Sequence, residues 1–184
     1  MEVIGQTQDD AVGEAFDKAA KIMGLPYPGG PLVDRYAQLG NAKAYKFSTT
    51  VMPNLDFSFS GIKTAFLYFI RDGKLKDPDF VEKNRNDICA SIQHHLVNML
   101  LVRLEQASRQ TGITQIAIAG GVSANSGLRK ALQEMGQRNA WSEYIPAFEY
   151  CTDNAAMIAM AGHYKFLKGE FAALDVTPLA RMPI

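Results

Sequence analysis

The chain has 184 residues, of which 47% are hydrophobic and 21% are charged, and its formal net charge is +0. These values predict an ordinary globular protein of one domain or two small ones, and they exclude a chain-wide basic field for holding nucleic acid. No apolar run approaches the length of a membrane span, so we expect no membrane partner. Cys89 and Cys151 lack metal-type spacing, which favours reduced thiols and a cytoplasmic location.

The first segment reads as a strand followed by a helix. Glu2–Thr7 resembles a strand already in progress, so we expect the chain to be the C-terminal part of a longer protein. Asp9–Met23 has apolar residues at helical spacing, and Asp9 and Asp10 stand where they would cap that helix. Asp17 lies close to the apolar face, and taken alone it is best interpreted as a solvated carboxylate that pairs with a neighbouring lysine.

The middle of the chain is predicted to be mostly helical. Leu25–Pro31 is a rigid proline and glycine loop, and Leu55–Phe59 alternates apolar and polar residues as a half-buried strand does. The long helix that begins at Asp77 carries a possible break at Asn84–Asn86. The helices are expected over Leu32–Leu39, Ile62–Arg71 and from Asp77 to about Gln110.

The stretch from Thr114 to Leu132 organises the rest of the sequence. Gln115–Ala119 predicts a strand buried on both faces, after which Gly120 and Gly121 permit a tight turn into a helix. The N-cap candidates of that helix are Ser123, Asn125 and Ser126. Such a strand, turn and helix suits an anion, although many α/β domains use the same turn purely for packing.

The remaining candidates lie near the end of the chain and on the long helix. Glu143–Phe148 is expected to be extended, and Tyr150–Lys168 to be the last helix. Asp153 competes with its neighbours to cap that helix, and the alternative is a ligand or metal carboxylate at a helix mouth. His94 and His95 point about 100° apart on a straight helix, so we interpret both as surface residues.

Four longer segments carry a family resemblance. They are DDAVGEAFDKAAKIMGLPYPGGP at Asp9–Pro31, LDFSFSGIKTA at Leu55–Ala65, AGGVSANSGLR at Ala119–Arg129 and CTDNAAMIAMAG at Cys151–Gly162. In this order and spacing they resemble the TsaD family, the bacterial tRNA N6-adenosine threonylcarbamoyltransferases formerly named O-sialoglycoprotein endopeptidases or glycoproteases. The resemblance covers nearly the whole chain.

The resemblance implies both a fold and a reaction. The fold is a helix-rich α/β lobe with a small incomplete sheet, the C-terminal lobe of an actin/Hsp70-like ATPase of the ribonuclease-H-like type. The reaction moves a threonylcarbamoyl group from threonylcarbamoyl-adenylate to N6 of the adenosine beside the anticodon, in tRNAs that read codons beginning with A. The implied partners are tRNA, a paralogous TsaB-like subunit and a small TsaE-like ATPase.

The resemblance also assigns residues. It implies that Asp17 contacts the nucleotide sugar, that Gly30 and Asp34 line the same nucleoside site, and that Asn125 holds the nucleotide from the other side. Asp153 would be one ligand of iron or zinc. No side chain of the sequence resembles an activated nucleophile, which agrees with direct transfer of the carbamoyl group from the adenylate to the amine.

The sequence departs from the family in one respect. It contains neither the HxxxH pair nor the Ser-Gly-Gly-His loop of the N-terminal lobe, and its three histidines do not replace them. We therefore expect this chain alone to bind metal weakly, to be inactive in transfer and to self-associate through exposed apolar surface. The alternatives are a non-catalytic nucleotide-binding or interaction lobe, a metallo-glycoprotease as in the older family name and, more weakly, a sugar kinase.

Overall fold

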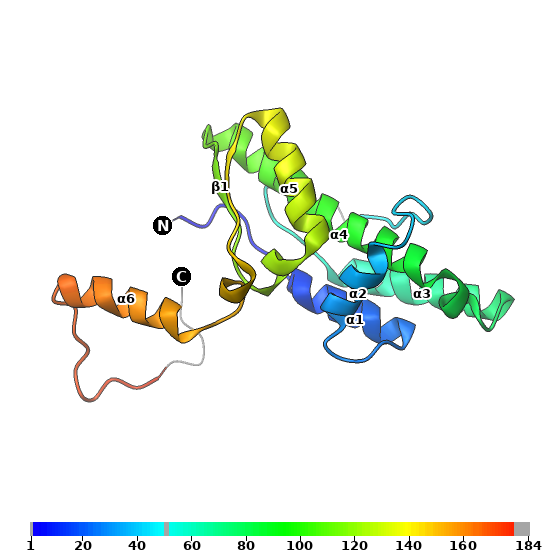
Figure 1. Cartoon of the computed structure of the whole chain (residues 1–184), viewed down its shortest axis with the longest axis horizontal. Helices are drawn as coiled ribbons and strands as arrows, with labels where there is room; N and C mark the ends of the chain where they lie inside the picture. Colours follow the sequence, from blue (N-terminus) through cyan, green and yellow to red (C-terminus); the bar gives the residue numbers. More distant parts are fainter. Residues whose placement is uncertain (1, 50–51, 179–184) are drawn as a thin grey trace.

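The computed structural model describes residues 2–49 and 52–178, and this part of the chain is dominated by helices (Figure 1). The predicted class, a helix-rich α/β fold with a small incomplete sheet, is confirmed. The helices are α1 Val12–Met23, α2 Gly29–Ala37, α3 Ser60–Lys76, α4 Phe80–Thr111, α5 Ser126–Asn139 and α6 Ala155–Leu167. The strands β1 Gln115–Ala117 and β2 Ser142–Tyr144 pair in parallel, with Gln115 opposite Ser142.

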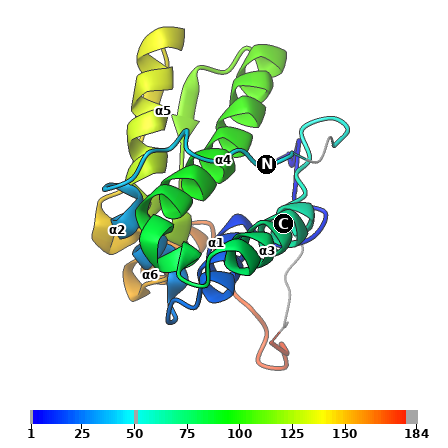
Figure 2. The same cartoon turned by 90° about the vertical axis from the view of Figure 1, so that its right-hand side faces the viewer.

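The long helix α4 is the axis on which the other elements pack. Its 32 residues run without interruption, so the break considered at Asn84–Asn86 is absent. Helices α1, α2 and α3 lie along its first half, while α5 and the sheet lie at its other end (Figures 1 and 2). Helix α6 projects from this body, and none of its residues is buried within the described part of the chain.

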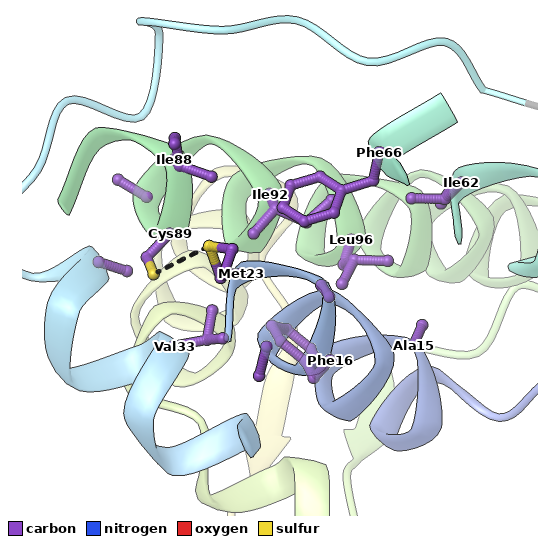
Figure 3. Packing of buried hydrophobic residues seen from close by; sticks show 14 of the residues in the cluster. Ala15, Phe16, Met23, Val33, Ile62, Phe66, Ile88, Cys89, Ile92 and Leu96 are labelled. Carbon is purple, nitrogen blue, oxygen red and sulfur yellow. Dashed lines mark hydrogen bonds between the residues drawn. The ribbon is translucent and has the colours of Figure 1, made fainter. Parts of the chain in front are cut away.

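The main core lies between the first half of α4 and the three helices before it. Phe16 of α1, Val33 of α2 and Phe66 of α3 converge on Ile92 and Leu96 of α4 (Figure 3). All five side chains are buried. This apolar contact holds α1 and α2 in the positions from which their polar residues form the candidate site.

A smaller core lies under the sheet, where Leu132 and Trp141 pack with Ile116 of β1. Ile116 is the buried residue of β1, whereas Gln115 and Ala117 on either side of it are exposed. The prediction of a strand covered on both faces is therefore wrong. The described helices cover one face of this two-stranded sheet, so the alternate side chains of β1 remain open.

The sequence also overpredicted strands near the N-terminus. Glu2–Thr7 and Leu55–Phe59 form a single parallel bridge between Thr7 and Phe57 instead of two full strands. The backbone hydrogen bonds from Gln8 to Phe57 and from Phe57 to Gln6 account for this contact. One bridge satisfies few backbone groups, and the regular strand pattern does not extend beyond it.

Several helix ends differ from the predicted ones. Helix α1 begins at Val12, and Asp9 does not cap it. Helix α2 begins at Gly29, before the proline expected to start it, and α6 begins at Ala155 with Asn154 as its N-cap. The expected extended segment at Glu143–Phe148 is strand only as far as Tyr144, after which residues 148–150 form a short 3₁₀ turn, η2 Phe148–Tyr150.

Candidate functional site

Asp17 joins α1 to the start of α2. Its Oδ1 atom accepts hydrogen bonds from the backbone N–H groups of Gly29 (2.8 Å) and Gly30 (2.9 Å). These N–H groups belong to the first turn of α2, which has no intrahelical partner for them, so the carboxylate caps that helix from outside. Within the described residues, no hydrogen bond reaches the second oxygen, Oδ2, which leaves it available to a ligand.

Gly29 allows this close approach of the two helices. A Cβ atom at Gly29 would lie 2.3 Å from the Cβ of Ala20 and 3.2 Å from the Cα of Asp17. The absence of a side chain therefore lets α2 begin directly against α1. Gly30 is one residue further along, where its backbone is fixed by the same Asp17 oxygen.

Asp34 joins α2 to the start of α5. It lies one turn after Gly30, and its Oδ1 accepts the hydroxyl of Ser126 at 2.7 Å while its Oδ2 accepts the Ser126 backbone N–H at 3.0 Å. Ser126 is the first residue of α5, so this carboxylate also sits at the positive end of a helix. The contact brings α2 beside Asn125, the residue before Ser126.

Asn125 is the N-cap of α5. It is one of the three residues that the sequence offered for this position, with Ser123 and Ser126. Its side-chain Oδ1 accepts the N–H of Leu128 at 2.9 Å, and its Nδ2 donates to Oε1 of Gln93 at 2.8 Å. Asn125 and Gln93 are both buried. Both polar atoms of the Asn125 amide are therefore already bonded. One of the two Nδ2 hydrogens is left to donate to a ligand.

The glycine turn before α5 is open. Gly120 has φ = 81°, a conformation that favours glycine, and a short 3₁₀ turn, η1 Gly121–Ala124, follows it. A Cβ atom at Gly120 or Gly121 would meet nothing within 4 Å. The N–H groups of Ser126 and Leu128 are bonded to Asp34 and Asn125, so few donors of the first turn of α5 remain for an anion and the backbone of the glycine turn is more open to one.

The four residues predicted to contact nucleotide thus form one continuous row. Asp17 is bonded to Gly30, Gly30 precedes Asp34 by one helical turn, and Asp34 is bonded to the neighbour of Asn125. Beside the row lies an open cleft of ≈ 660 Å³ between α2, α4 and α5. Its lining includes Gln93 and Ser126, the hydrogen-bond partners of Asn125 and Asp34, but none of the four residues of the row.

Asp153 lies outside this row. It is exposed, directly before the N-cap of α6. Within residues 2–49 and 52–178, no three histidine, cysteine, aspartate or glutamate side chains gather closely enough to hold a metal ion. One exposed carboxylate is too small a donor set for iron or zinc, so the residues described do not by themselves fit a metal centre.

The adjacent histidines of α4 differ from the prediction in one respect. His94 is exposed as expected, but His95 is half-buried against the ring of Phe47, with ring centroids 5.9 Å apart. The Nε2 atom of His95 is buried without a hydrogen-bond partner in the described chain. Burial and the nearby charge of His94 lower the pKa of His95. Phe47, from the segment before α3, covers the side of α4 that carries His95, and the helical pattern alone does not reveal this contact.

Two residues of the site have no clear signal in the sequence. Gln93 stands next to the apolar stripe of α4, and nothing in its spacing shows that it holds Asn125. Arg129 of α5 bonds to the backbone of Ser123 and Pro146, contacts that its place in the helical pattern does not reveal. Both act through contacts between distant segments, which periodicity does not predict.

Two further results concern the class of protein. Both cysteines are free and buried, in agreement with the expectation of reduced thiols. Among the helices described, none combines the length and the apolar character that crossing a membrane requires.

Comparison with known proteins places these observations in a family. The family model described as "TsaD: tRNA N6-adenosine threonylcarbamoyltransferase" matches residues 1–160. A protein of that name from Cytophaga hutchinsonii is 59% identical over 100% of this chain and 54% of its own length. Those from Christiangramia forsetii (60% over 98% of this chain and 53% of its own length) and Porphyromonas gingivalis (53% over 100% and 54%) are similar. The chain spans about half the length of these curated relatives.

Proposed function

Because the chain belongs to the TsaD family, we propose that it carries one half of the nucleotide site of a tRNA N6-adenosine threonylcarbamoyltransferase. The whole enzyme would transfer a threonylcarbamoyl group from threonylcarbamoyl-adenylate to N6 of the adenosine next to the anticodon, in tRNAs that read codons beginning with A. The row of Asp17, Gly30, Asp34 and Asn125 is the nucleoside-binding half of that site.

The observation that carries this proposal is the unequal use of the two oxygens of Asp17. Oδ1 is occupied by the N–H groups of Gly29 and Gly30, so the orientation of the carboxylate is fixed before any ligand arrives. Oδ2 remains without a hydrogen bond in the described structure. A carboxylate held in this way is a strong acceptor for the hydroxyls of a ribose, because the protein has already restricted its side-chain freedom.

The other members of the row have complementary roles in this proposal. Gly30 lets a nucleoside lie against the backbone, Asn125 offers its remaining Nδ2 hydrogen, and the open Gly120–Gly121 turn offers backbone N–H groups to a phosphate. Transfer would then depend on holding the adenylate in position while AMP leaves, which is catalysis by orientation and charge stabilisation. No side chain of the row is needed as a nucleophile.

The proposal extends to the fold and the partners of the whole protein. We place this chain as the C-terminal lobe of an actin/Hsp70-like, ribonuclease-H-like fold, with an N-terminal lobe that completes the cleft. tRNA, a TsaB-like subunit and a TsaE-like ATPase are the partners that we propose for the whole protein. A cytoplasmic location agrees with the two free thiols.

The proposed metal depends on residues beyond those described. Asp153 is exposed and its carboxylate accepts no hydrogen bond in this part of the chain, so it can supply one oxygen to iron or zinc. Such an ion would polarise a carbonyl or phosphoryl oxygen when bound. The remaining ligands must come from outside the described residues, and the roles derived above for Asp17, Asp34 and Asn125 do not involve the metal.

A second function is supported for the chain in isolation. The nucleotide row is assembled entirely from its own helices, whereas the metal donors gathered here amount to one carboxylate. We therefore propose that the chain alone binds nucleotide without turning it over.

The test is a calorimetric titration of the chain with ADP, comparing the wild type with Asp17→Asn. An asparagine can still accept the Gly29 and Gly30 N–H groups through its Oδ1, but it replaces Oδ2 with an amide that cannot accept a ribose hydroxyl. We expect binding to weaken about tenfold, equivalent to about 1.4 kcal/mol, with only a small fall in the thermal midpoint from the loss of a charged cap on α2. Asp72→Asn, an exposed site on α3, is the matched control. Equal affinities of wild type and Asp17→Asn, or no binding by the folded wild type, would contradict the proposed half-site.

A further inference from the structure

Arg129 binds several segments at once through a single side chain. Its Nε donates to the carbonyl of Ser123 at 2.7 Å, and its Nη2 donates to the carbonyl of Pro146 at 2.6 Å. The same Nη2 lies 3.2 Å from the sulfur of Cys151. The guanidinium carbon also stands 4.0 Å from the centroid of the Phe148 ring, within the range of a cation–π contact.

These contacts connect two segments that both belong to the proposed site. Ser123 lies in the turn between Gly120 and Asn125, and Cys151 lies two residues before Asp153. The two hydrogen bonds from Arg129 to Pro146 and Cys151 are the side-chain hydrogen bonds that join residues 146–154 to the rest of the described chain. The other side-chain hydrogen bonds of this segment stay inside it, or cap α6.

The exposure of α6 makes the contacts of Arg129 important for holding residues 146–154. Every residue of α6 from Ala155 to Leu167 is exposed, so α6 does not anchor the segment before it to the described body. Cys151, in contrast, is only 1% exposed, and it is covered where Arg129 and the η2 turn meet. The direction in which the chain leaves towards Asp153 is therefore set at Arg129.

We propose that Arg129 is a positioning residue that fixes the Cys151–Asp153 segment against the turn leading to Asn125. This inference rests on the proposed function, because it assigns to Arg129 the spacing between Asp153 and the nucleotide half-site. The role requires a planar guanidinium: one donor faces Ser123, another faces Pro146 and Cys151, and the flat face covers Phe148. A lysine ammonium has the charge but cannot satisfy these directions together.

The first test measures the accessibility of the two thiols in the native chain with a thiol reagent such as Ellman's reagent. In the wild type both thiols are buried and should react slowly. Arg129→Met and Arg129→Lys should each expose Cys151 and leave Cys89 protected, so that a single thiol per chain reacts rapidly. Adding Cys151→Ser to either variant should remove that signal. Arg138→Met is the control, because Arg138 lies on the same helix and, within the described part of the chain, its side chain bonds only to the backbone of Glu134.

Two outcomes of the thiol assay decide the matter. Slow reaction of both thiols in Arg129→Lys and Arg129→Met, as in the wild type, would overturn the proposal. If Arg129→Met loses its fold and both thiols react, the test rests on the folded Arg129→Lys variant. Rapid reaction of one thiol in that variant supports the proposal, and slow reaction of both thiols overturns it. This assay does not depend on enzyme activity, so its result stands even if the proposed function is wrong.

The second test uses the full-length protein with its partners, threonylcarbamoyl-adenylate and tRNA. Arg129→Lys should lower kcat roughly tenfold to a hundredfold with little change in the KM for the adenylate, because the nucleotide row does not include Arg129. The affinity of the chain for ADP should also stay within about twofold of wild type. A rise in KM at constant kcat would instead make Arg129 a nucleotide-binding residue and contradict the positioning role. Absence of activity in the wild type would count against the proposed function, and the thiol assay would still test Arg129.

Discussion

The carboxylate of Asp34 accepts both the hydroxyl and the backbone N–H of Ser126, at 2.7 Å and 3.0 Å, across 92 positions of sequence. This pair ties α2 to the first residue of α5, and α5 in turn begins at the N-cap Asn125. A charged acceptor at a helix N-terminus is favourable both for its hydrogen bonds and for the helix dipole. The position of Asn125 in the row therefore depends on Asp34 as much as on its own side chain.

The first prediction separates the two bonds of this pair. Ser126→Ala removes the hydroxyl but keeps the backbone N–H, and we expect it to lower the free energy of unfolding by about 1 kcal/mol. Asp34→Ala removes both bonds and should cost roughly 2 kcal/mol. Because Ser126→Ala has no hydroxyl left to lose, the double variant should be less destabilised than the sum of the single ones. Urea denaturation of the four proteins measures this coupling, and simple additivity would show that the hydroxyl contributes nothing through Asp34.

Asp9 shows a similar long-range cap, at the start of α3. Its Oδ1 accepts the N–H groups of Phe59 and Ser60, and its Oδ2 accepts the hydroxyls of Ser58 and Ser60, each at 2.6 Å. Desolvation by the neighbouring groups raises the pKa of Asp9, but the hydrogen bonds from the serine side chains and the backbone outweigh it and hold the pKa well below its ordinary value. The ionised form is thus the one that the folded chain selects.

The second prediction follows from that cap. Asp9→Ala should lower the free energy of unfolding by about 2 kcal/mol at neutral pH, the upper end for loss of an N-terminal cap. A carboxylate whose folded pKa is depressed stabilises the chain above its unfolded pKa of 3.8, and this stability is lost as the pH falls below that value. The difference between wild type and variant should therefore shrink below pH 3.8. Chemical denaturation at several pH values checks this, and a difference that does not vary with pH would contradict it.

The two capping aspartates show which parts of the fold the sequence reveals. Helical periodicity predicts a long helix from Asp77 to about Gln110, and α4 runs from Phe80 to Thr111, because its buried stripe is a local pattern repeated many times. Asp9 stands directly before α1 and reads as its cap, yet it caps α3 some fifty positions later. Local sequence shows that Asp9 is a good acceptor, but only the packed structure decides which helix it serves.

The candidate site divides in the same way. Asn125 is recognisable as a cap because its side chain bonds three residues ahead, within one turn. Its partner Gln93 comes from α4, 32 positions earlier, and no spacing rule connects them. His95 is a residue for which the local prediction is wrong. Its position on the helix predicts exposure, but Phe47, from the segment before α3, packs against its ring. Family resemblance supplied the row of residues, but not the contacts that already occupy them.

The third prediction concerns the space that Gly127 leaves for Gln93. A Cβ at this position would lie 2.5 Å from Nε2 of Gln93, whose Oε1 is held by Asn125. Gly127→Ala should therefore break the Gln93–Asn125 bond and lower the free energy of unfolding by about 1 kcal/mol. In a Gln93→Ala background the contact with Gln93 is absent, and Oδ1 of Asn125, 3.3 Å from the new Cβ, need move only slightly. The same substitution should then stabilise the chain by roughly 0.5 kcal/mol through helix propensity. Thermal or urea denaturation of the four proteins tests this change of sign, and the same effect in both backgrounds would refute it.

The fourth prediction concerns the half-buried imidazole of His95. Burial, reinforced by the charge of His94, lowers its pKa below the ordinary 6.5, and its Nε2 has no partner in the described chain. The unfolded chain consequently takes up a proton more readily than the folded chain, so stability should fall as the pH drops through 6.5. His95→Phe keeps an aromatic ring against Phe47 without a titratable group, and it should flatten this decline. His94→Gln is the control: because His94 is exposed, that variant should retain most of the slope. Urea denaturation between about pH 5.5 and about pH 7.5 measures both variants, and an equally steep decline in His95→Phe would assign the pH dependence to another group.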